Sequence, residues 1–442
     1  MNVKIELENQ EVPRYLRVYN YYRELILAEK MLPETKLPSI RKGAAQFQMS
    51  RTTMESAYLL LAAEGYIISR PQSGYYVTDI AKRQNQATEL QKRKNKKKEA
   101  EIQYDFVSFG VDKESFHFEL WRRYMKSALR QDERLLSYGE PQGEMEFREV
   151  LCNYLQEKRS VICTPDQIVI GAGVQSLLNI LCPLLKERNK IAFYNPDYRQ
   201  GTTVFEDYGF EIADNYKTAE NGIYYITPSQ MSQAGEVMKV SERLALVREA
   251  TEKNILLIED DYNHEFRYFQ KPAPSLQGLA AGKDIVYLGS FSKMLLPSIR
   301  MSFMVLPPDL QERYEVKKSF YNQTASKAEQ IALTQFIRDG HLESQIRKSR
   351  KIHLAKANEL AEAAKEIWKD SCVLQIEESG FQVCLEFDSG WNAKEVAERA
   401  KQEKIAVIPL GETEGRVRIG LSTANVTIQA YREALEKIKE LS

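Results

Sequence analysis

The sequence predicts a chain of two domains: a small helical domain that ends in a β-hairpin, and a larger α/β domain. Length is the first observation, because 442 residues exceed the usual domain size of about 100–200 residues. The second observation is the pattern of apolar residues along the chain. Residues 11–78 show helical spacing and then two short strands, whereas from residue 104 to residue 442 apolar runs alternate with amphipathic stretches. Segment 79–103 lacks apolar periodicity and is predicted to be a charged linker.

Composition narrows the class of protein. A hydrophobic fraction of 43% is enough for packed cores. No apolar run reaches the roughly 18 residues of a membrane helix, and no signal peptide is recognisable. The five cysteines are odd in number and form no C-x-x-C pair, and there are only four histidines. We therefore expect a cytoplasmic protein with reduced thiols, no membrane contact and no metal site.

Charge is distributed unevenly although the net charge is zero. Residues 1–100 hold 18 Lys and Arg against 11 Asp and Glu, so they carry +7 and the remainder carries −7. This imbalance favours contact between the N-terminal part and a polyanion, although chance can also produce it. The basic run 92–98 in the linker has two interpretations, solvation of the linker or loose contact with DNA phosphates.

Three helices and a hairpin are expected in residues 11–78. A first helix covers roughly Pro13–Glu29, and a second begins around Leu37–Arg41, where proline and serine suit the first positions. Ser50 is a plausible N-cap of the third helix. The core-facing residues of this helix would be Met54, Ala57 and Leu61, and the exposed residues at its start would be Arg51, Thr52, Thr53 and Ser56. Residues 66–77 are expected to form a hairpin wing.

Several ordered segments of this region resemble the GntR family of winged helix-turn-helix repressors. They are Leu37-Pro38-Ser39-x-Arg41, Ser50-Arg51-Thr52-Thr53, Ala57-Tyr58-x-x-Leu61, Glu64-Gly65 and Ser73-Gly74-Tyr75. The resemblance implies binding to double-stranded DNA. In it Arg41 holds a phosphate, Arg51, Thr52 and Thr53 contact the major groove, and Ser73 and Gly74 approach the minor groove. Alternatively, the two arginines are ordinary surface residues and Thr53 only starts a helix.

The larger domain is predicted to contain buried parallel strands with helices between them. Each run has strand length, and several end against Gly, Pro, Asp or Ser. The six runs are Gln167–Ile170, Lys190–Phe193, Gly222–Ile226, Asn254–Ile258, Asp284–Leu288 and Ser302–Leu306.

Segment 287–300 suggests covalent cofactor chemistry. A strand leads into a turn rich in Ser and Gly that carries Lys293, and Arg300 follows seven residues later. A desolvated lysine can bond to a carbonyl cofactor, while hydroxyls and a guanidinium hold a phosphate. Taken alone, Ser-x-Ser-Lys is usually a solvated loop.

Two further segments support the same chemistry. The strand 256–260 ends in carboxylates, one of which could keep a pyridine nitrogen protonated, although acids at a strand end often only cap a helix. The strand 168–170 runs into Gly171-Ala172-Gly173 and a helix start, where free backbone N–H groups favour a phosphate. Many folds contain such a turn.

The order of these segments, with Asn195–Tyr198 between them, resembles fold-type I aminotransferases from about residue 104 to the C-terminus. Fusion to a GntR-type head resembles the MocR subfamily of regulators. The resemblance implies pyridoxal 5′-phosphate as cofactor, held by Lys293 through a Schiff base. The other implied cofactor contacts are Asp260 and Tyr262 on the ring nitrogen and hydroxyl, Tyr198 on the ring face, Val174, Gln175, Ser290 and Arg300 on the phosphate, and Tyr138 on the partner subunit's phosphate.

An effector site is implied as well. Arg418 would take the carboxylate of an amino-acid effector, with Arg416 as its rival and Arg199 as a possible helper. Segment 227–235 departs from the subfamily pattern Thr-Pro-x-His-Gln-x-Pro-x-Gly, because glutamine stands in place of the histidine and of the second proline. This departure puts efficient transamination in doubt.

The sequence therefore favours a homodimeric DNA-binding regulator that senses the cofactor or a small amine or amino-acid effector. The alternative is a working pyridoxal-phosphate-dependent aminotransferase with a DNA-binding appendage. A third possibility, a dimerisation scaffold without cofactor, conflicts with the intact Lys293, Asp260 and Ser290/Arg300 set.

Overall fold

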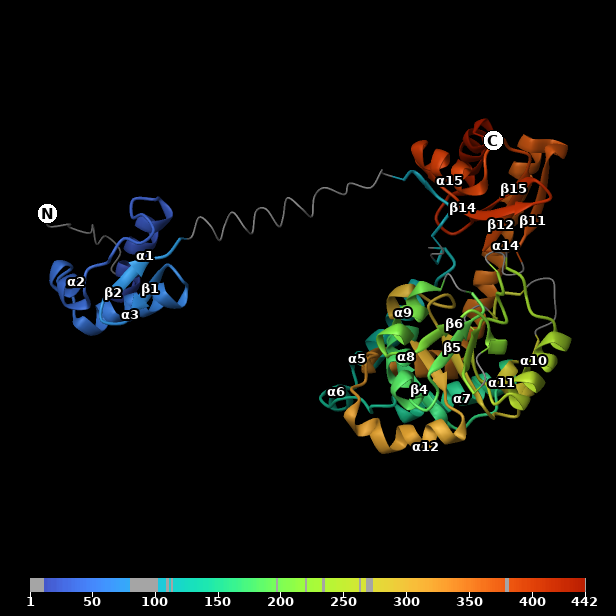
Figure 1. The fold of residues 1–442 in the computed structure, drawn as a ribbon, viewed down its shortest axis with the longest axis horizontal. Coiled ribbons are helices and arrows are strands. Elements are labelled where there is room, and N and C mark those ends of the chain that lie inside the picture. The colour runs from blue at the N-terminus through green and yellow to red at the C-terminus, as the bar shows by residue number, and fades with distance from the viewer. Residues whose placement is uncertain are drawn as a thin grey trace. The chain divides into compact units, whose positions relative to one another are not determined.

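A computed structural model describes residues 12–79, 102–108, 111–112, 114–195, 198–218, 221–232, 235–261, 264–267, 273–377 and 381–441. The chain divides into two compact units, residues 1–99 and 100–442 (Figure 1). Most of the predicted linker, residues 80–101, lies outside the described residues, as does Tyr262. Among the described residues no helix is both long and apolar enough to span a membrane.

The first unit contains three helices and a hairpin. Its elements are α1 (Arg14–Leu27), α2 (Ile40–Gln46), α3 (Arg51–Ala63), β1 (Ile67–Arg70) and β2 (Gly74–Val77). The two strands pair antiparallel. Met54, Ala57 and Leu61 of α3 are fully buried against α1 and the hairpin, as their spacing predicted.

Serine side chains fix the starts of α2 and α3. The hydroxyl of Ser39 accepts a hydrogen bond from the backbone N–H of Lys42 at 3.3 Å. The hydroxyl of Ser50 accepts from the N–H of Thr53 at 3.1 Å, so the predicted N-cap is confirmed. Each cap satisfies a donor that the helix itself cannot pair.

The second unit is built around a seven-stranded sheet in the order β4-β10-β9-β8-β7-β5-β6. Its strands are β4 (Ile168–Gly171), β5 (Lys190–Phe193), β6 (Glu211–Ala213), β7 (Ile223–Ile226), β8 (Leu256–Asp260), β9 (Ile285–Ser290) and β10 (Ser302–Val305). The sheet is mixed, so the prediction of parallel strands throughout was wrong for β10, which is antiparallel to β4 and β9. The connection 291–301 is too short for the crossover that a parallel pair requires. The edge strand β6 was not predicted, because its three residues, Glu211, Ile212 and Ala213, form no apolar run of strand length; Glu211 is exposed and the other two are half-buried.

Helices cover both faces of this sheet. One face packs against α5 (Phe118–Leu129), α7 (Met145–Arg159), α10 (Val240–Glu252), α11 (Leu276–Leu279) and α13 (Lys327–Arg338). The other packs against α8 (Val174–Leu181), α9 (Arg199–Asp207) and α12 (Pro308–Lys317). The short helix α6 (Asp132–Leu135) follows α5. Side chains alternate between the two cores along each strand, so Ile168 and Ile170 enter one core and Val169 the other.

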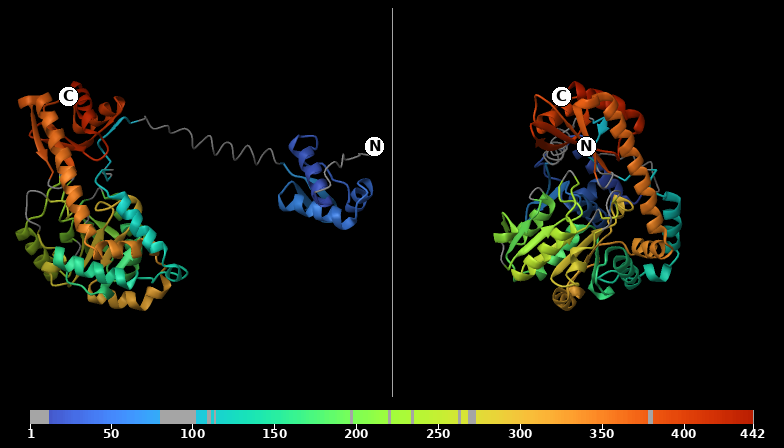
Figure 2. Two further views of the ribbon diagram at one scale, coloured as in Figure 1. Left: turned by 180° about the vertical axis from the view of Figure 1, so that it is seen from behind. Right: turned by 90° about the vertical axis from the view of Figure 1, so that its right-hand side faces the viewer.

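A second sheet closes the C-terminal end. Helix α14 (His341–Trp368) leads into the antiparallel strands β11 (Cys372–Ile376), β12 (Gln382–Phe387), β15 (Arg416–Ser422) and β14 (Ile408–Thr413). Figure 2 shows this sheet at one end of the unit, joined to the rest by α14. Helices α15 (Ala393–Gln402) and α16 (Ile428–Glu440) complete its core, and β13 (Ile405–Ala406) pairs with β3 (Tyr104–Asp105).

Replacing Ser50 with alanine is expected to loosen the start of α3, because it removes the cap of the Thr53 N–H. A lost N-cap costs about 1 kcal/mol, which corresponds to roughly fivefold faster hydrogen exchange in the first turn. Hydrogen exchange of the full-length protein measures this. Ser56→Ala is the matched control, because the Ser56 hydroxyl donates only to the Thr52 carbonyl within the helix. Equal exchange in the two variants would contradict the assignment of the cap.

Candidate functional site

A cavity of about 360 Å³ lies at the carboxyl ends of the parallel strands, the edge where open α/β sheets usually bind ligands. Strands β7, β8 and β9 each send residues into it from their ends. The described residues that line it are Gly173, Val174, Gln175, Asn195, Tyr198, Gln200, Tyr225, Thr227, Gln230, Ser232, Asp260, Ser290, Ser292, Lys293, Arg300 and Ser302. The cavity therefore brings together most of the predicted cofactor contacts.

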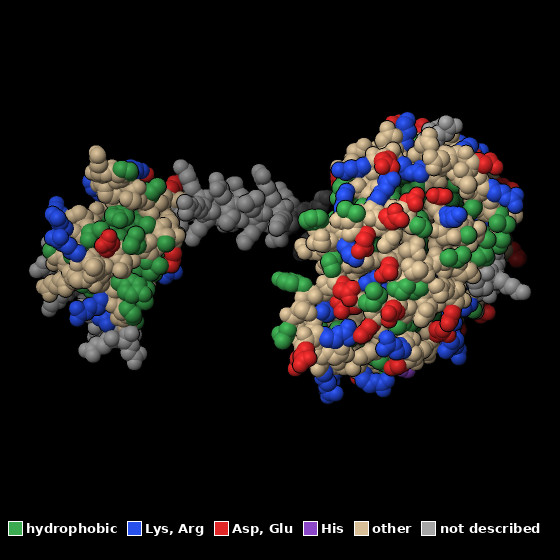
Figure 3. Space-filling model, turned by 90° about the horizontal axis from the view of Figure 1, so that it is seen from below, with side chains coloured by type: hydrophobic (Ala, Val, Ile, Leu, Met, Phe, Trp, Pro, Cys, Tyr) green, Lys and Arg blue, Asp and Glu red, His purple; other side chains and the backbone are tan. Residues whose placement is uncertain are grey.

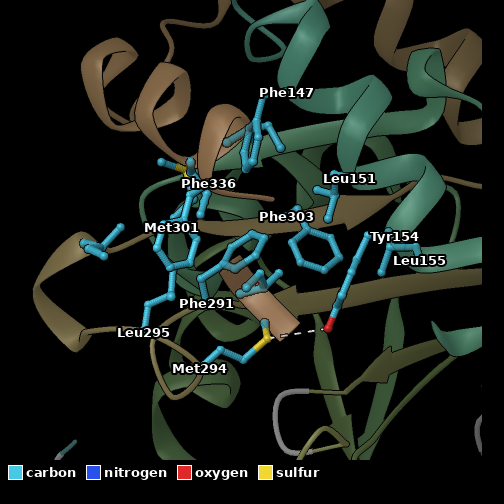
Figure 4. Close-up of a cluster of buried hydrophobic side chains, with 14 of the residues drawn as sticks. Phe147, Leu151, Tyr154, Leu155, Phe291, Met294, Leu295, Met301, Phe303 and Phe336 are labelled. Carbon is cyan, nitrogen blue, oxygen red and sulfur yellow. Dashed lines mark hydrogen bonds between the residues drawn. The ribbon is translucent and has the colours of Figure 1, made fainter. Parts of the chain in front are cut away.

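Lys293 enters the cavity from the turn after β9. The turn is anchored because the neighbouring side chains Phe291, Met294 and Leu295 are buried in the core beneath it (Figure 4). Burial lowers the pKa of Lys293 to about 8, against the opposing effect of the charges on Glu377 and Asp260. An amine with such a pKa has a much larger unprotonated fraction near neutral pH than an ordinary lysine, which favours nucleophilic attack on a carbonyl.

Asp260 projects into the cavity from the last position of β8. Its Oδ2 accepts a hydrogen bond from the Tyr225 hydroxyl at 2.6 Å. Its Oδ1 is buried and has no hydrogen-bond partner among the described residues. Burial raises the pKa of Asp260 to about 7, although the bond from Tyr225 lowers it. A buried carboxylate with an unpaired oxygen is suited to a cationic N–H of a ligand.

The adjacent acids point to the other face of β8, because side chains alternate along a strand. Asp261 accepts from Arg159 Nε at 2.8 Å and from the Tyr287 hydroxyl at 2.9 Å, and it also pairs with Ser229. Burial opposes ionisation, but Arg159 holds the pKa of Asp261 well below its usual range. Glu259 accepts from the backbone N–H groups that begin α11. Of the three acids, Asp260 is therefore the ligand-facing one and the other two are structural.

The part of the cavity next to the start of α8 suits an anion. Gly173 precedes α8 with a φ of 95°, and a Cβ at this position would collide with the guanidinium of Arg300. The N-terminal residues Val174 and Gln175 lie at the positive end of the helix. The Ser290 hydroxyl donates to Ser292 and accepts from Ser302, at 3.1 Å in both cases. Backbone N–H groups, hydroxyls and a guanidinium are the donors that phosphate prefers.

Tyr198 closes one side of the cavity at the start of α9. Its ring packs at 5.3 Å from that of Tyr225, with the planes tilted by 36°. Burial raises its pKa to about 12, so the phenol remains neutral. Pro196 and Asp197 of the same predicted segment lie outside the described residues.

Three described residues that were predicted as contacts, Tyr138, Arg418 and the helper Arg199, do not line the cavity. Tyr138 is fully exposed, and its role toward a partner subunit stays a prediction. The guanidinium of Arg418 lies 3.9 Å from Glu386 and donates to Thr413 at 3.4 Å. Its rival Arg416 pairs with Asp388 at 3.3 Å. Neither arginine is placed at the cavity.

Several lining residues were not predicted as contacts. Tyr225 could have been suspected, because a tyrosine near the end of a buried strand beside β8 can reach Asp260. Ser292 and Ser302 flank the lysine turn but belong to no separate motif. The rest are Asn195, Gln200, Thr227, Gln230 and Ser232, of which the last three belong to the departing segment 227–235.

The first unit exposes Arg41, Arg51 and Thr52 of the residues predicted to contact DNA. Thr53 is half-buried rather than exposed as predicted, and Ser73 and Gly74 are half-buried as well. Arg51 and Thr52 are exposed at the start of α3, and Arg41 is exposed in the first turn of α2. The Ser50 hydroxyl also bonds those of Thr52 and Thr53, at 2.9 and 2.7 Å. Ser73 ends the hairpin turn of residues 71–73, and Gly74 begins β2 with a φ of 106°. In contrast, acidic and basic side chains are interspersed over the visible face of the second unit (Figure 3).

Comparison with known families finds a matching family for each of the two units. The family "Aminotransferase class I and II" matches residues 111–438, and "Bacterial regulatory proteins, gntR family" matches residues 14–77. The HTH-type transcriptional regulator YdeL of Bacillus subtilis is 33% identical, covering 97% of this chain and 96% of its own. The probable rhizopine catabolism regulatory protein MocR of Rhizobium meliloti is 27% identical over 85% of this chain and 82% of its own.

Solved structures resemble the second unit in fold. The kynurenine aminotransferase of Pyrococcus horikoshii has a TM-score of 0.64 at 21% identity, covering 80% of this chain and 94% of its own. The multiple substrate aminotransferase of Thermococcus profundus has a TM-score of 0.65, also at 21% identity, over 80% of this chain and 94% of its own.

Replacing Asp261 with asparagine is expected to destabilise the protein by about 3–5 kcal/mol, because Arg159 keeps a buried charge without its counter-charge. Urea unfolding of the full chain measures the loss. Glu187→Gln breaks the exposed pair with Arg313 and should cost less than about 1 kcal/mol. A similarly small loss of unfolding free energy in both variants would show that the buried pair does not stabilise this part of the fold.

Proposed function

Because this chain belongs to the MocR-type regulators, which join a GntR-type winged helix-turn-helix domain to an aminotransferase class I and II domain, we propose that it senses an amine through its cofactor pocket and changes its DNA binding in response. Pyridoxal phosphate is the cofactor indicated by the aminotransferase family. The effector is a small amine or amino acid.

The arrangement of Lys293 and the buried Asp260 in one cavity carries this proposal. Lys293 would hold the cofactor covalently, and the unpaired Oδ1 of Asp260 would accept from its ring nitrogen. The bound cofactor supplies an electrophilic carbonyl carbon and an electron-withdrawing ring. The residues of this chain supply a desolvated amine and a buried carboxylate, which orient that group and hold a proton on its ring nitrogen.

Other lining residues would contact the phosphate and the ring face of the cofactor. Arg300, Ser290 and the N–H groups that begin α8 at Val174 and Gln175 would hold the phosphate. Tyr198 would lie on the ring face. Gly173 supports these roles, because its lack of a Cβ leaves room for the Arg300 guanidinium beside the helix start.

The GntR-type domain binds DNA. We assign base and backbone contacts to Arg51, Thr52 and Thr53 and a phosphate contact to Arg41. Ser73 and Gly74 of the hairpin would approach the minor groove. A homodimer would present two such domains to paired half-sites. An effector can alter DNA affinity only through a difference in its affinity for the two states, typically about 1–3 kcal/mol.

The second candidate function is transamination, which the retained Lys293, Asp260 and Tyr198 favour. Gln230 and Ser232 line the cavity in the segment that departs from the subfamily pattern, and Arg418 is paired outside it. Sustained turnover of an amino donor with a keto acid would favour this alternative.

Lys293→Ala is expected to abolish the imine absorbance that appears when the wild-type protein is mixed with pyridoxal phosphate, because the variant lacks the amine. It should also lose any dependence of DNA affinity on the cofactor, which in the wild type amounts to about 5- to 150-fold at typical coupling energies. Spectrophotometric titration and DNA-binding assays measure both. Lys283→Ala is the control, because Lys283 is exposed outside the cavity. An unchanged absorbance in Lys293→Ala would refute the assignment.

Arg51→Ala is expected to weaken specific DNA binding by about 5- to 100-fold. If Arg51 contacts a phosphate, the slope of log K against log salt also decreases in magnitude by about 1. Lys30→Ala removes an equal charge from an exposed position after α1 and should change little. Equal losses for the two variants would mean that only net charge matters.

A further inference from the structure

The amine of Lys293 lies over an aromatic ring. Its Nζ is 5.3 Å from the centroid of Phe381, which precedes β12 and is 3% exposed. The ring of Phe381 contacts those of Phe266, with the centroids 4.6 Å apart, and His353, with the centroids 4.4 Å apart. An ammonium at this distance from a desolvated ring face is attracted by the negative charge of that face.

A buried carboxylate accompanies the ring. Glu377 follows β11 and is 2% exposed, and its backbone N–H donates to the Gln382 carbonyl at 3.0 Å. Its side chain packs against Gly235, which leaves no room for a Cβ there. Among charged groups, Glu377 has the largest effect on Lys293, ahead of Asp260. The charge on Glu377, which follows the C-terminal strand β11, therefore favours the ammonium form of Lys293.

Among the other titratable groups near Lys293, Asp260 also favours the ammonium, but less than Glu377 does. Asp260 on β8 is bonded to Tyr225 and faces the cavity from the sheet. His353 on α14 is fully buried, and burial lowers its pKa to about 4, so it is neutral. Next to His353, Lys356 is paired with Asp112. Phe381 and Glu377 therefore define one cation-binding place from the C-terminal side.

We propose that Phe381 and Glu377 form an ammonium seat for Lys293, which holds the lysine amine whenever an effector amine displaces it from the cofactor. This inference rests on the proposed function. It assigns to the seat a positioning role: it acts through Lys293 and sets how readily an amine is sensed.

The exchange balances without an oxidant or reductant. The effector would arrive as an ammonium, and its nitrogen would give up protons as it forms the C=N bond to the cofactor's carbonyl carbon. The C=N bond between that carbon and the Lys293 nitrogen would break, and the freed lysine nitrogen would take up the same number of protons and become an ammonium. The seat stabilises the resulting lysine ammonium and thereby favours the effector-bound state.

The first test uses the cofactor-free full-length protein. Acetic anhydride labels unprotonated amines, so the extent of labelling of Lys293 against pH, measured by mass spectrometry, gives its apparent pKa. Phe381→Leu and Glu377→Gln should each shift this profile to lower pH, because each removes an interaction that favours the ammonium. For the ring the shift is about 0.5–1.5 units.

Two variants separate the seat from general packing. Phe266→Leu perturbs the same aromatic cluster without removing the ring under the amine, and it should leave the profile unchanged. Phe381→Tyr keeps the ring face and should retain the wild-type profile. The proposal is wrong if Phe381→Leu matches Phe266→Leu, or if Phe381→Tyr shifts as far as Phe381→Leu.

The second test uses the cofactor-loaded protein and ethylamine as the probe. The ethylamine concentration that half-converts the Lys293-bound cofactor, followed by absorbance, should rise about 2- to 30-fold in Phe381→Leu and stay unchanged in Phe266→Leu. Equal midpoints in the wild type and Phe381→Leu would overturn the seat. A protein that does not load the cofactor would instead overturn the proposed function, while the labelling profiles would still decide the seat.

Discussion

The buried ion pair between Arg159 and Asp261 is the interaction on which the site depends. Their side chains are 1% and 0% exposed, and Arg159 Nε lies 2.8 Å from Asp261 Oδ2. Arg159 ends α7 and also donates to the Ala273 carbonyl, so one guanidinium joins a helix, a loop and the end of β8. Removing two charges from water costs free energy, and the attraction and hydrogen bonds between Arg159 and Asp261 offset this cost. The pair fixes the end of β8 and thus the direction of Asp260.

Burial then acts on the two cavity groups in opposite directions. It raises the pKa of Asp260 to about 7 and lowers that of Lys293 to about 8. Both charged forms are disfavoured by the same low dielectric. The acid and the amine therefore titrate close to neutral pH, where a small change in the charge nearby alters their protonation. A bound cofactor or an incoming amine is such a change, which makes this cavity suitable for sensing as well as for chemistry.

Local patterns were enough to predict the elements that carry the site. The runs of strand length, the Gly171–Gly173 turn, the acidic end of β8 and the Lys293 turn are contiguous in sequence, and the Ser50 cap depends on a residue three positions away. The remainder depends on pairs distant in sequence. Arg159 and Asp261 are 102 residues apart, and Phe381 reaches Lys293 from the C-terminal sheet. No periodicity encodes such contacts. The direction of β10 was missed because a run of apolar residues carries no strand polarity.

The energy available to the sensor limits how it can work. Coupling between two sites is typically about 1–3 kcal/mol, and a desolvated cation–π contact contributes about 2 kcal/mol. Movement of one lysine amine between the cofactor and the ring of Phe381 is thus of the right size to bias a conformational equilibrium, without large refolding. Phe381 immediately precedes β12 of the C-terminal sheet and packs in the core beside the central sheet, and Lys293 lies in the turn after β9. The position of the amine therefore changes the contact between these two segments. Such a change in contact is the physical element that a regulatory signal requires.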